Sequence, residues 1–253
     1  MEYVRYRYQE KISYGVLDGN IVREIDGGLF GGRKATGFSA DLSAVELLWP
    51  CEPTKILAVG LNYKSHLGSQ PAPANPEIFF KPPSALLHPG GAIKLPQNSR
   101  DVHYEGELVA VIGKTTRNVS VSEAEDCIFG FTCGIDVSER YWQKNDLQWW
   151  RAKGCDTFAP LGPAVCAGYD WSRGRIETRV NSSVVQSGKF SELLFDPFKI
   201  VSYISQHLTL MPGDVIYTGT PGHTGALKSG DLIEVDIEGI GILRITVTGY
   251  AIP

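Results

Sequence analysis

The sequence contains no apolar run that approaches the ~18 residues of a membrane-spanning helix, so we expect no transmembrane helix. It contains no basic block either, and 24 lysines and arginines against 28 acidic residues give a formal net charge of −4. Binding to nucleic acid or to an anionic membrane through charge is therefore not expected. The N-terminus lacks the apolar segment of a secretory signal peptide. These absences favour a cytoplasmic globular protein.

The chain has few cysteines, and their spacing does not indicate disulfide bonds. The five cysteines are Cys51, Cys127, Cys133, Cys155 and Cys166. Their number is odd and no pair forms a CxxC motif, which argues against a disulfide framework and against a zinc site. We interpret them as small buried residues of a protein in a reducing compartment.

The 253 residues suit one large domain with a small accessory unit. Residues 1–48 read as short antiparallel strands with a hairpin turn at 18–20, and prolines at 50 and 53 indicate a boundary. We therefore predict a small N-terminal β domain over 1–48 and a catalytic domain over 49–253. The segment 68–75 is rich in proline, alanine and polar residues and predicts a mobile surface loop.

Strand patterns dominate the larger part of the chain. Two helices are predicted, one over 120–127 behind a capping serine and one beginning at Asp196-Pro197. Strands are predicted over 128–136, 175–180, 184–186, 214–218, 231–237 and 241–247. Many strands, few helices and frequent glycine indicate a β-rich α+β fold, barrel-like or sandwich-like.

Two glutamates stand one residue apart before the apolar run 108–112. Side chains alternate along a strand, so Glu105 and Glu107 face the same side, where two buried like charges repel. No lysine or arginine within the strand neutralises them. A divalent cation between them resolves the problem, and Asp136, at the end of a second apolar strand, is the best third ligand. Three carboxylates with open positions suit Mg²⁺ or Mn²⁺, although Glu-x-Glu alone is also compatible with a solvent-facing strand.

Several cationic and hydroxyl side chains are candidates for the same site. If the chain turns helical after Asp136, then Asp136, Arg140 and Gln143 share one face, where Arg140 grips a substrate carboxylate and Gln143 adds a hydrogen bond. An Asp–Arg surface pair is the alternative. Lys153, among tryptophans and glycine, is expected to hold Glu107 or Asp136 from behind.

Two histidines and one threonine complete the candidates. His66 follows a buried strand and precedes the 68–75 loop, a position that suits a general base under a closing segment. His103 lies two residues before Glu105 and is a metal ligand, a support for a carboxylate or a packing residue. Thr220, in a Pro-Gly turn after a strand, offers a hydroxyl to a carboxylate.

These motifs together resemble the fumarylacetoacetate hydrolase family over about residues 50–250. The matching segments are 56–66, 78–84, 104–114, 130–143, 152–157 and 212–221. The resemblance implies a mixed β-sandwich roll behind a small N-terminal β unit, a homodimer, and Mg²⁺ or Mn²⁺ held by Glu105, Glu107 and Asp136. It also implies support of the metal by Lys153 and Thr157, and a lid base at His66. Contacts to the substrate's oxo-acid end are implied for Arg140, Gln143 and Thr220, and we add Lys81 to this group.

One position departs from the family pattern. Many small members carry glutamate three residues after the lid histidine, and this chain has Ser69 there. Serine cannot take up a proton as a carboxylate does, so either Glu77, the next acid along the chain, or another acid replaces the glutamate, or water activation is weaker and the reaction differs.

The leading hypothesis is metal-dependent cleavage of a C–C bond in an acylpyruvate or related β-diketo acid, with His66, Lys153 and Glu77 as catalytic residues. Isomerisation of an unsaturated 2-oxo diacid and decarboxylation of oxaloacetate are alternatives, and Ser69 favours isomerisation because it needs no attacking water. A cation-dependent carboxylate-binding protein without turnover is the alternative outside enzymes.

Overall fold

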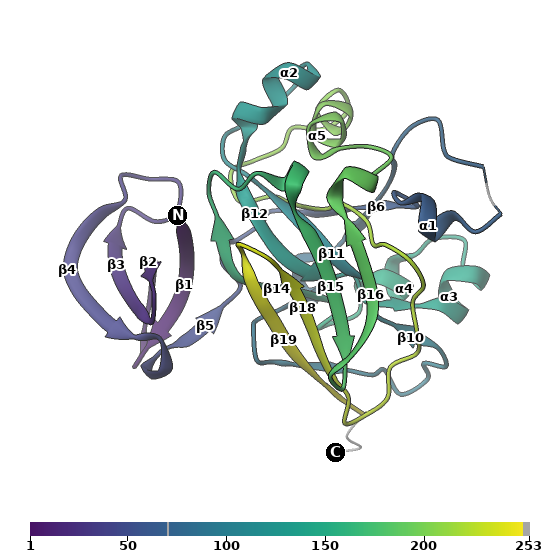
Figure 1. Cartoon of the computed structure of the whole chain (residues 1–253), viewed down its shortest axis with the longest axis horizontal. Coiled ribbons are helices and arrows are strands. Elements are labelled where there is room, and N and C mark those ends of the chain that lie inside the picture. The colour runs from purple at the N-terminus through teal and green to yellow at the C-terminus, as the bar shows by residue number, and fades with distance from the viewer. Residues whose placement is uncertain (70, 250–253) are drawn as a thin grey trace.

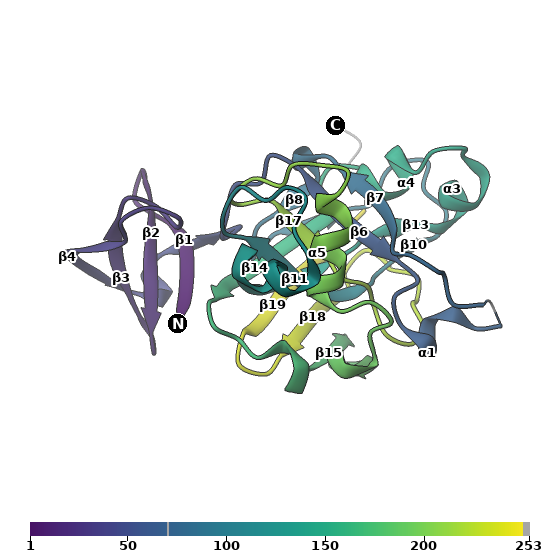
Figure 2. The ribbon, with the colours of Figure 1, turned by 90° about the horizontal axis from the view of Figure 1, so that it is seen from above.

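The computed structural model describes residues 1–69 and 71–249, and a small N-terminal unit stands beside a larger body (Figures 1 and 2). The loop expected at 68–75 has no helix or strand in its described residues, and Gln70 lies outside them.

Consecutive antiparallel strands form the N-terminal unit. They are β1 (Glu2–Tyr8), β2 (Lys11–Asp18), β3 (Ile21–Asp26) and β4 (Lys34–Asp41), and β5 (Glu46–Leu48) returns to pair with β1. Gly19, with a φ of +59°, forms the turn between β2 and β3, which confirms the hairpin predicted at 18–20. Val4, Tyr6 and Val22 form a small core of this unit together with Ala164 of the body.

The largest sheet runs through both units in the order β4-β3-β2-β1-β14-β12-β11-β17-β6-β7. Its strands in the body are β6 (Ile56–Gly60), β7 (Glu77–Lys81), β11 (Gly106–Ile112), β12 (Ile128–Ile135), β14 (Ala159–Cys166) and β17 (Val215–Tyr217), with the short β8 (Leu86–Leu87) beside β14. Strand β17 is parallel to β6 and antiparallel to β11, so the sheet is mixed. β1 joins β14 through the pairs Glu2↔Cys166 and Tyr3↔Val165.

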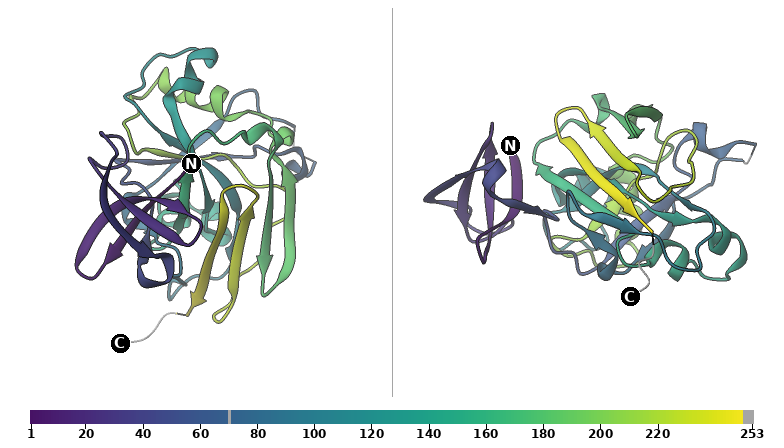
Figure 3. Two further views of the ribbon diagram at one scale, coloured as in Figure 1. Left: turned by 60° about the vertical axis from the view of Figure 1, so that its left-hand side comes forward. Right: turned by 90° about the horizontal axis from the view of Figure 1, so that it is seen from below.

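A second sheet covers one face of the body, in the order β16-β15-β18-β19-β9. Its strands are β9 (Ala92–Lys94), β15 (Arg175–Val180), β16 (Ser183–Lys189), β18 (Leu232–Ile237) and β19 (Gly241–Thr248); Figure 3 shows β18 and β19 side by side in yellow. Buried residues alternate along β18, whereas all of β11 is buried. The two sheets enclose the main core, where each fully buried leucine, valine or isoleucine contributes about 1.5–3 kcal/mol.

Short helices lie outside the sheets. They are α1 (Lys64–Leu67), α2 (Val121–Ala124), α3 (Arg140–Asn145), α4 (Trp150–Gly154) and α5 (Pro197–Ser205). The 3-10 helices are η1 (Leu42–Ala44), η2 (Pro83–Ala85), η3 (Glu125–Cys127), η4 (Trp171–Arg173) and η5 (Phe190–Glu192). None of the helices over 1–69 and 71–249 is long and apolar enough to cross a membrane.

Both predicted helices form, and both start at the predicted caps. Ser120 forms a capping box with Glu123 at α2, and the Asp196 side chain accepts the Lys199 N–H at the start of α5. The six strands predicted after residue 127 are present as β12 and β15 to β19, and the five cysteines are free, as expected. The β-rich prediction is confirmed.

Candidate functional site

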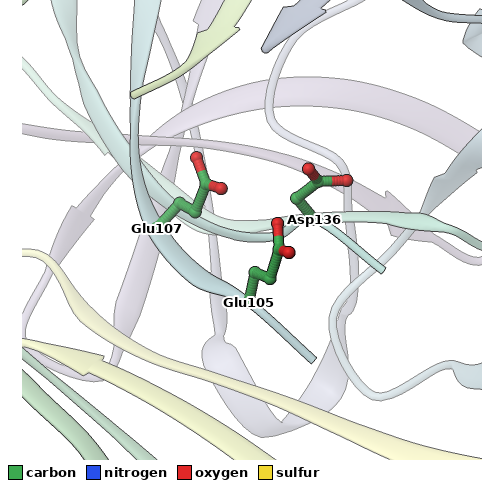
Figure 4. A group of neighbouring side chains, drawn as sticks. All are labelled: Glu105, Glu107 and Asp136. Carbon is green, nitrogen blue, oxygen red and sulfur yellow. The ribbon is translucent and has the colours of Figure 1, made fainter. Parts of the chain in front are cut away.

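Three carboxylates meet where β11 begins and β12 ends. Glu105 precedes β11, Glu107 is its second residue and Asp136 follows β12. The antiparallel register pairs Gly106 with Ile135, and the Asp136 N–H donates to the Glu105 carbonyl at 2.9 Å. The three carboxylates point into a common space (Figure 4), and their candidate ligand atoms lie within 4.8 Å of one another.

Gly106, between the two glutamates, lets the two sheets approach each other at this point. A Cβ there would lie 2.0 Å from Oγ1 of Thr178 in β15 and 3.2 Å from a methyl of Val235 in β18. A side chain at position 106 would therefore push the sheets apart and move both glutamates.

Cationic side chains from distant segments reach two of the three carboxylates. Lys153 Nζ lies 2.5 Å from Asp136 Oδ2 and 3.0 Å from Glu105 Oε2, and Lys81 Nζ lies 2.6 Å from Asp136 Oδ1. Arg140 forms an ion pair with Glu105. The strand itself carries no cation, but the tertiary structure supplies three, so the carboxylates of Glu105 and Asp136 are already compensated.

Glu107 differs from its neighbours. Its Oε2 accepts the Gly219 N–H at 2.6 Å, and no ion pair to it is found among the described residues. Burial raises the pKa of Glu107 well above its ordinary value, and the charges of Asp136 and Glu105 raise it further. A buried carboxylate compensated only by a neutral donor is costly.

The pKa values of Glu105 and Asp136 depend on how far their cationic partners offset the effect of burial. Burial would raise the pKa of Glu105, but Lys153 and Arg140 hold that pKa well below its ordinary value. Burial also raises the pKa of Asp136, and Lys153 and Lys81 offset only part of this rise.

The donor set fits a hard divalent cation. All three candidate ligands are carboxylates, without the sulfur or imidazole ligands that softer metals select, and Glu107 lacks a cationic partner. Glu105, Glu107 and Asp136 are therefore the residues that would hold such an ion, and Lys153 would sit behind two of them.

A cavity of about 80 Å³ opens onto Glu105 and Glu107 of this trio. Its lining residues come from six segments and are Val59, Gly60, Leu61, His66, Phe79, Glu105, Glu107, Arg140, Gln143, Trp149, Lys153 and Thr220. The structure thus brings seven of the ten sequence-predicted site residues to one cavity, namely His66, Glu105, Glu107, Arg140, Gln143, Lys153 and Thr220.

Arg140 and Gln143 line the cavity, but not through the helix face expected from sequence. Helix α3 begins only at Arg140, because β13 (Ser138–Glu139) pairs with β10 (Val102–His103) directly before it. Asp136 therefore does not belong to the helix, and Arg140 pairs with Glu105 instead. Arg140 Nη1 donates to Gln143 Oε1 at 2.7 Å, so the two side chains form one polar surface.

His66 lies in α1 and its Nδ1 is 2.7 Å from the Gly222 carbonyl oxygen. A carbonyl only accepts hydrogen bonds, so Nδ1 carries the proton and Nε2 is left with a free lone pair. The Gly222 N–H in turn donates to Ser65 Oγ at 3.0 Å, which holds the two segments together. The histidine is thereby oriented as a base toward the cavity that it lines.

Glu77 does not share this cavity. It is an exposed residue of β7, opposite Gly60 in the sheet, and lines a neighbouring hollow. Ser69 is exposed. Among the described residues, no carboxylate hydrogen-bonds to His66. The expectation that Glu77 replaces the family's lid glutamate is therefore not supported by any contact between the two residues.

Lys81, Thr220 and Thr157 make contacts other than those expected. Lys81 is buried behind Asp136 and is absent from the cavity lining, so it contacts a candidate metal ligand instead of a substrate. The Thr220 hydroxyl lines the cavity but donates to the Gly106 carbonyl at 2.8 Å, so its proton is not free for a carboxylate. The Thr157 hydroxyl accepts the Lys94 N–H at 2.9 Å.

His103 supports the arginine, not a carboxylate ligand. Its Nδ1 lies 2.8 Å from Thr224 Oγ1 and its Nε2 lies 2.8 Å from Asp101 Oδ1. Thr224 Oγ1 in turn accepts from Arg140 Nη2 at 3.1 Å. This chain of contacts orients Arg140.

Sequence reasoning missed two buried polar residues. Glu139, at the N-cap of α3, accepts the N–H groups of Arg100 and Asp101 at 2.8 Å each and that of Trp142 at 2.5 Å. An acid directly before a helix was a usable capping signal. Gln186 of β16 accepts the Gly106 N–H and donates to Thr220 Oγ1 and the Pro221 carbonyl. No local pattern marks Gln186, because its partners lie 34 to 80 residues away.

Known proteins resemble both units of this chain. Residues 55–248 match the model of the fumarylacetoacetate (FAA) hydrolase C-terminal family, and residues 1–50 match that of an Rv2993c-like N-terminal family. A structure named 5-carboxymethyl-2-hydroxymuconate delta-isomerase from Mycobacterium smegmatis is 40% identical, with a TM-score of 0.94 over 99% of this chain and 100% of that one. A 2-hydroxyhepta-2,4-diene-1,7-dioate isomerase from Mycobacterium marinum is 39% identical, with a TM-score of 0.94 over all of both chains.

A curated relative extends the comparison beyond bacteria. The mitochondrial oxaloacetate tautomerase FAHD2A of Homo sapiens is 39% identical over 216 residues, which are 79% of this chain and 69% of the relative. The fold predicted from the resemblance is confirmed by the family match and by the solved structures. The chain belongs to the fumarylacetoacetate hydrolase family, whose members are enzymes.

Proposed function

We propose that the protein catalyses proton transfer within a 2-oxo acid, interconverting keto and enol forms or moving a double bond, with Mg²⁺ or Mn²⁺ held by Glu105, Glu107 and Asp136. The observation that carries the proposal is the hydrogen bond of His66 Nδ1 to the Gly222 carbonyl, in the cavity that also exposes the two glutamates. In the neutral imidazole this hydrogen bond fixes the proton on Nδ1, so the lone pair is on Nε2 of a ring that lines the same cavity as the two glutamates.

The substrate's acid end has a clear binding surface. Arg140 and Gln143 form a joined polar surface in the cavity, and a guanidinium binds a carboxylate in two-point geometry. A divalent cation on the three carboxylates would polarise the 2-oxo group and so make the neighbouring C–H more acidic.

The proton transfer needs only His66 among the cavity's side chains. Its Nε2 takes a proton from the carbon next to the 2-oxo group; the C–H electron pair forms the new carbon–carbon double bond, and the π pair of the 2-oxo group moves onto its oxygen to give the enolate. The imidazolium then returns the proton, to oxygen for tautomerisation or to a more distant carbon for isomerisation. No water is consumed, so this reaction does not require a carboxylate next to His66. It is compatible with an exposed Ser69 and with a Glu77 that lines the neighbouring hollow.

C–C bond hydrolysis, the leading hypothesis from sequence, is the second candidate. The family model that covers residues 55–248 is that of a hydrolase, and the same cation site would serve it. It requires an activated water, and the glutamate that pairs with the lid histidine for this purpose in many family members is replaced by Ser69 here; among the described residues no carboxylate hydrogen-bonds to His66. The names of the two isomerase structures and of the tautomerase relative also favour proton transfer.

The test is product analysis by proton NMR in deuterated water. Protein loaded with Mg²⁺ or Mn²⁺ is given oxaloacetate, an acylpyruvate and an unsaturated 2-oxo diacid. We expect deuterium at the carbon beside the 2-oxo group, or a shifted double bond, with the carbon skeleton intact. Acid fragments from the acylpyruvate would establish hydrolysis instead, and conversion of oxaloacetate to pyruvate with release of CO₂ would establish decarboxylation. Stabilisation by oxalate with no turnover of any substrate would indicate a binding protein.

His66→Gln should lower kcat by about 10²–10⁴-fold, the usual contribution of a general base, and should keep Mn²⁺ binding. His207→Gln is the matched control, because His207 is exposed at the end of α5 and contacts Tyr203 instead of the site. Equal activity of the two variants would contradict the role of His66.

A further inference from the structure

Two hollows lie next to each other beside the carboxylate trio and have two lining residues in common. The inner cavity measures about 80 Å³ and contains the site, and the outer hollow measures about 390 Å³. Phe79 and Trp149 line both. The other residues of the outer hollow are Glu77, Ile78, Phe80, Leu147, Gln148 and Trp150.

The two shared side chains pack against each other and form a wall. Their ring centroids are 5.5 Å apart with an interplanar angle of 73°, an edge-to-face contact of the kind that contributes about 0.5–1.5 kcal/mol beyond burial. We call this pair the Phe79–Trp149 wall.

The wall is anchored to the elements that build the site. Phe79 pairs with Ala58 in the sheet, and its ring centroid lies 4.7 Å from Lys153 Nζ. Trp149 is the N-cap of α4, and its carbonyl accepts the Lys153 N–H at 2.9 Å. Lys153, which holds Glu105 and Asp136, thus touches both halves of the wall.

The two sides of the wall suit different ligands. The inner cavity is far smaller than the ~300–1,000 Å³ typical of pockets for larger ligands, and its lining is dominated by polar residues. The outer hollow presents exposed apolar side chains: Phe80, Trp150 and Leu147 are 54%, 73% and 95% exposed. A short diacid fits the first environment, and an aryl or alkyl tail fits the second.

We propose that the Phe79–Trp149 wall determines substrate length. It closes the inner cavity so that the enzyme acts on short 2-oxo acids of about four carbons. Loss of either ring joins the cavity to the outer hollow and admits 2-oxo acids with an aryl tail. This inference rests on the proposed function, because it concerns the tail of a 2-oxo acid.

The first test compares turnover of oxaloacetate and phenylpyruvate by the Mn²⁺-loaded enzyme. The wild type should prefer oxaloacetate, and Phe79→Ala and Trp149→Ala should each move the ratio of kcat/KM toward phenylpyruvate by about tenfold or more. Phe80→Ala is the matched control, since Phe80 is the next residue of β7 and lines only the outer hollow. Its ratio should equal that of the wild type.

A second test does not depend on turnover. Oxalate and N-phenyloxamate, two unreactive analogues, are titrated calorimetrically into the same proteins with Mn²⁺ present. The wall variants should gain about tenfold or more in affinity for N-phenyloxamate relative to oxalate. Absence of turnover in the wild type would remove the proposed function and still leave this comparison valid.

Three results would overturn the inference: equal wild-type affinity for the two analogues, an unchanged ratio in the wall variants, or the same change in Phe80→Ala. If Phe79→Ala fails to fold, Trp149→Ala decides the question, because Trp149 is 37% exposed and its truncation leaves the core intact.

Discussion

The backbone N–H of Gly219 donates a hydrogen bond of 2.6 Å to the Glu107 carboxylate. Gly219 has a φ of +104°, which L side chains rarely adopt, and a Cβ there would lie 2.7 Å from the Cβ of Asn62. Glycine therefore allows the chain to present this donor. Lysine and arginine side chains compensate the charges of Glu105 and Asp136, whereas Glu107 has a neutral partner. Replacing one carboxylate or another should therefore change the stability of the protein in different ways.

Glu107→Gln should leave the metal-free protein as stable as the wild type, or more stable. The amide oxygen can still accept from Gly219, and a buried charge without a cationic partner is removed. Glu105→Gln should destabilise by about 3 kcal/mol, because it leaves Arg140 without its carboxylate and Lys153 with Asp136 alone. Urea unfolding without metal checks both values.

Both glutamate variants should lose the stabilisation that Mn²⁺ gives to the wild type, since each removes one of three ligands. Unfolding curves at increasing Mn²⁺ measure this loss. A strongly destabilised metal-free Glu107→Gln protein would show that this carboxylate has a cationic partner after all.

Lys81→Met should reduce stability by about 3–5 kcal/mol without raising the KM of the remaining activity. The Lys81 side chain is 0% exposed and pairs with Asp136, so its removal leaves a buried charge with one partner fewer. Arg140→Met is the comparison: that side chain is 23% exposed and lines the cavity, so KM should rise and stability should fall less. A raised KM with unchanged stability in Lys81→Met would restore the substrate-binding role expected from sequence.

Glu139→Gln should raise KM about tenfold and change kcat less. The amide keeps one acceptor oxygen but turns an NH₂ group toward one of the N–H groups of Arg100, Asp101 and Trp142, and an unsatisfied buried donor costs about 1–3 kcal/mol. The helix that carries Arg140 would shift. Steady-state kinetics measure the split, with the exposed Glu125→Gln as the control. A proportional fall of kcat with constant KM would exclude this positioning role.

Glu24→Gln should destabilise the protein at pH 7 and lose its effect in acid. Burial would raise the pKa of Glu24, but Lys11 and two hydroxyls lower it below its ordinary value. A lowered folded-state pKa means that the carboxylate stabilises the protein above the unfolded-state pKa, and that this stability is lost as the pH falls through the folded-state value. The difference from the wild type, about 1 kcal/mol at pH 7, should therefore shrink as the pH falls below the unfolded-state pKa of about 4.3 and vanish below the folded-state pKa. Denaturant unfolding between pH 3 and 7 tests this, and a constant difference would contradict it.

Local sequence was enough for the elements whose signals are local. The capped helices at 120–127 and 197–205 and the strands after residue 127 follow from capping residues and alternation, which act over a few neighbours. The shared orientation of Glu105 and Glu107 could likewise be predicted, because strand geometry alone places both side chains on one face.

Sequence patterns failed where a partner comes from a distant segment. Lys81 contacts Asp136, which is 55 residues away in the sequence, and Gln186 contacts Gly106, which is 80 residues away. Neither contact can be predicted from the spacing of residues within one helix or strand. The expected helix face at Asp136 and Arg140 was wrong because β10 and β13 pair first and delay α3.

The sequence by itself determined the fold class, the family and the carboxylate trio, since these depend on short-range alternation, capping and ordered motifs. The tertiary structure decided which charges are compensated, which tautomer His66 holds, and where the cavity ends. Those properties depend on Gly222, Lys153, Phe79 and Trp149 being brought together by sheet pairing and helix packing, and long-range packing of this kind leaves no periodic signal in the chain.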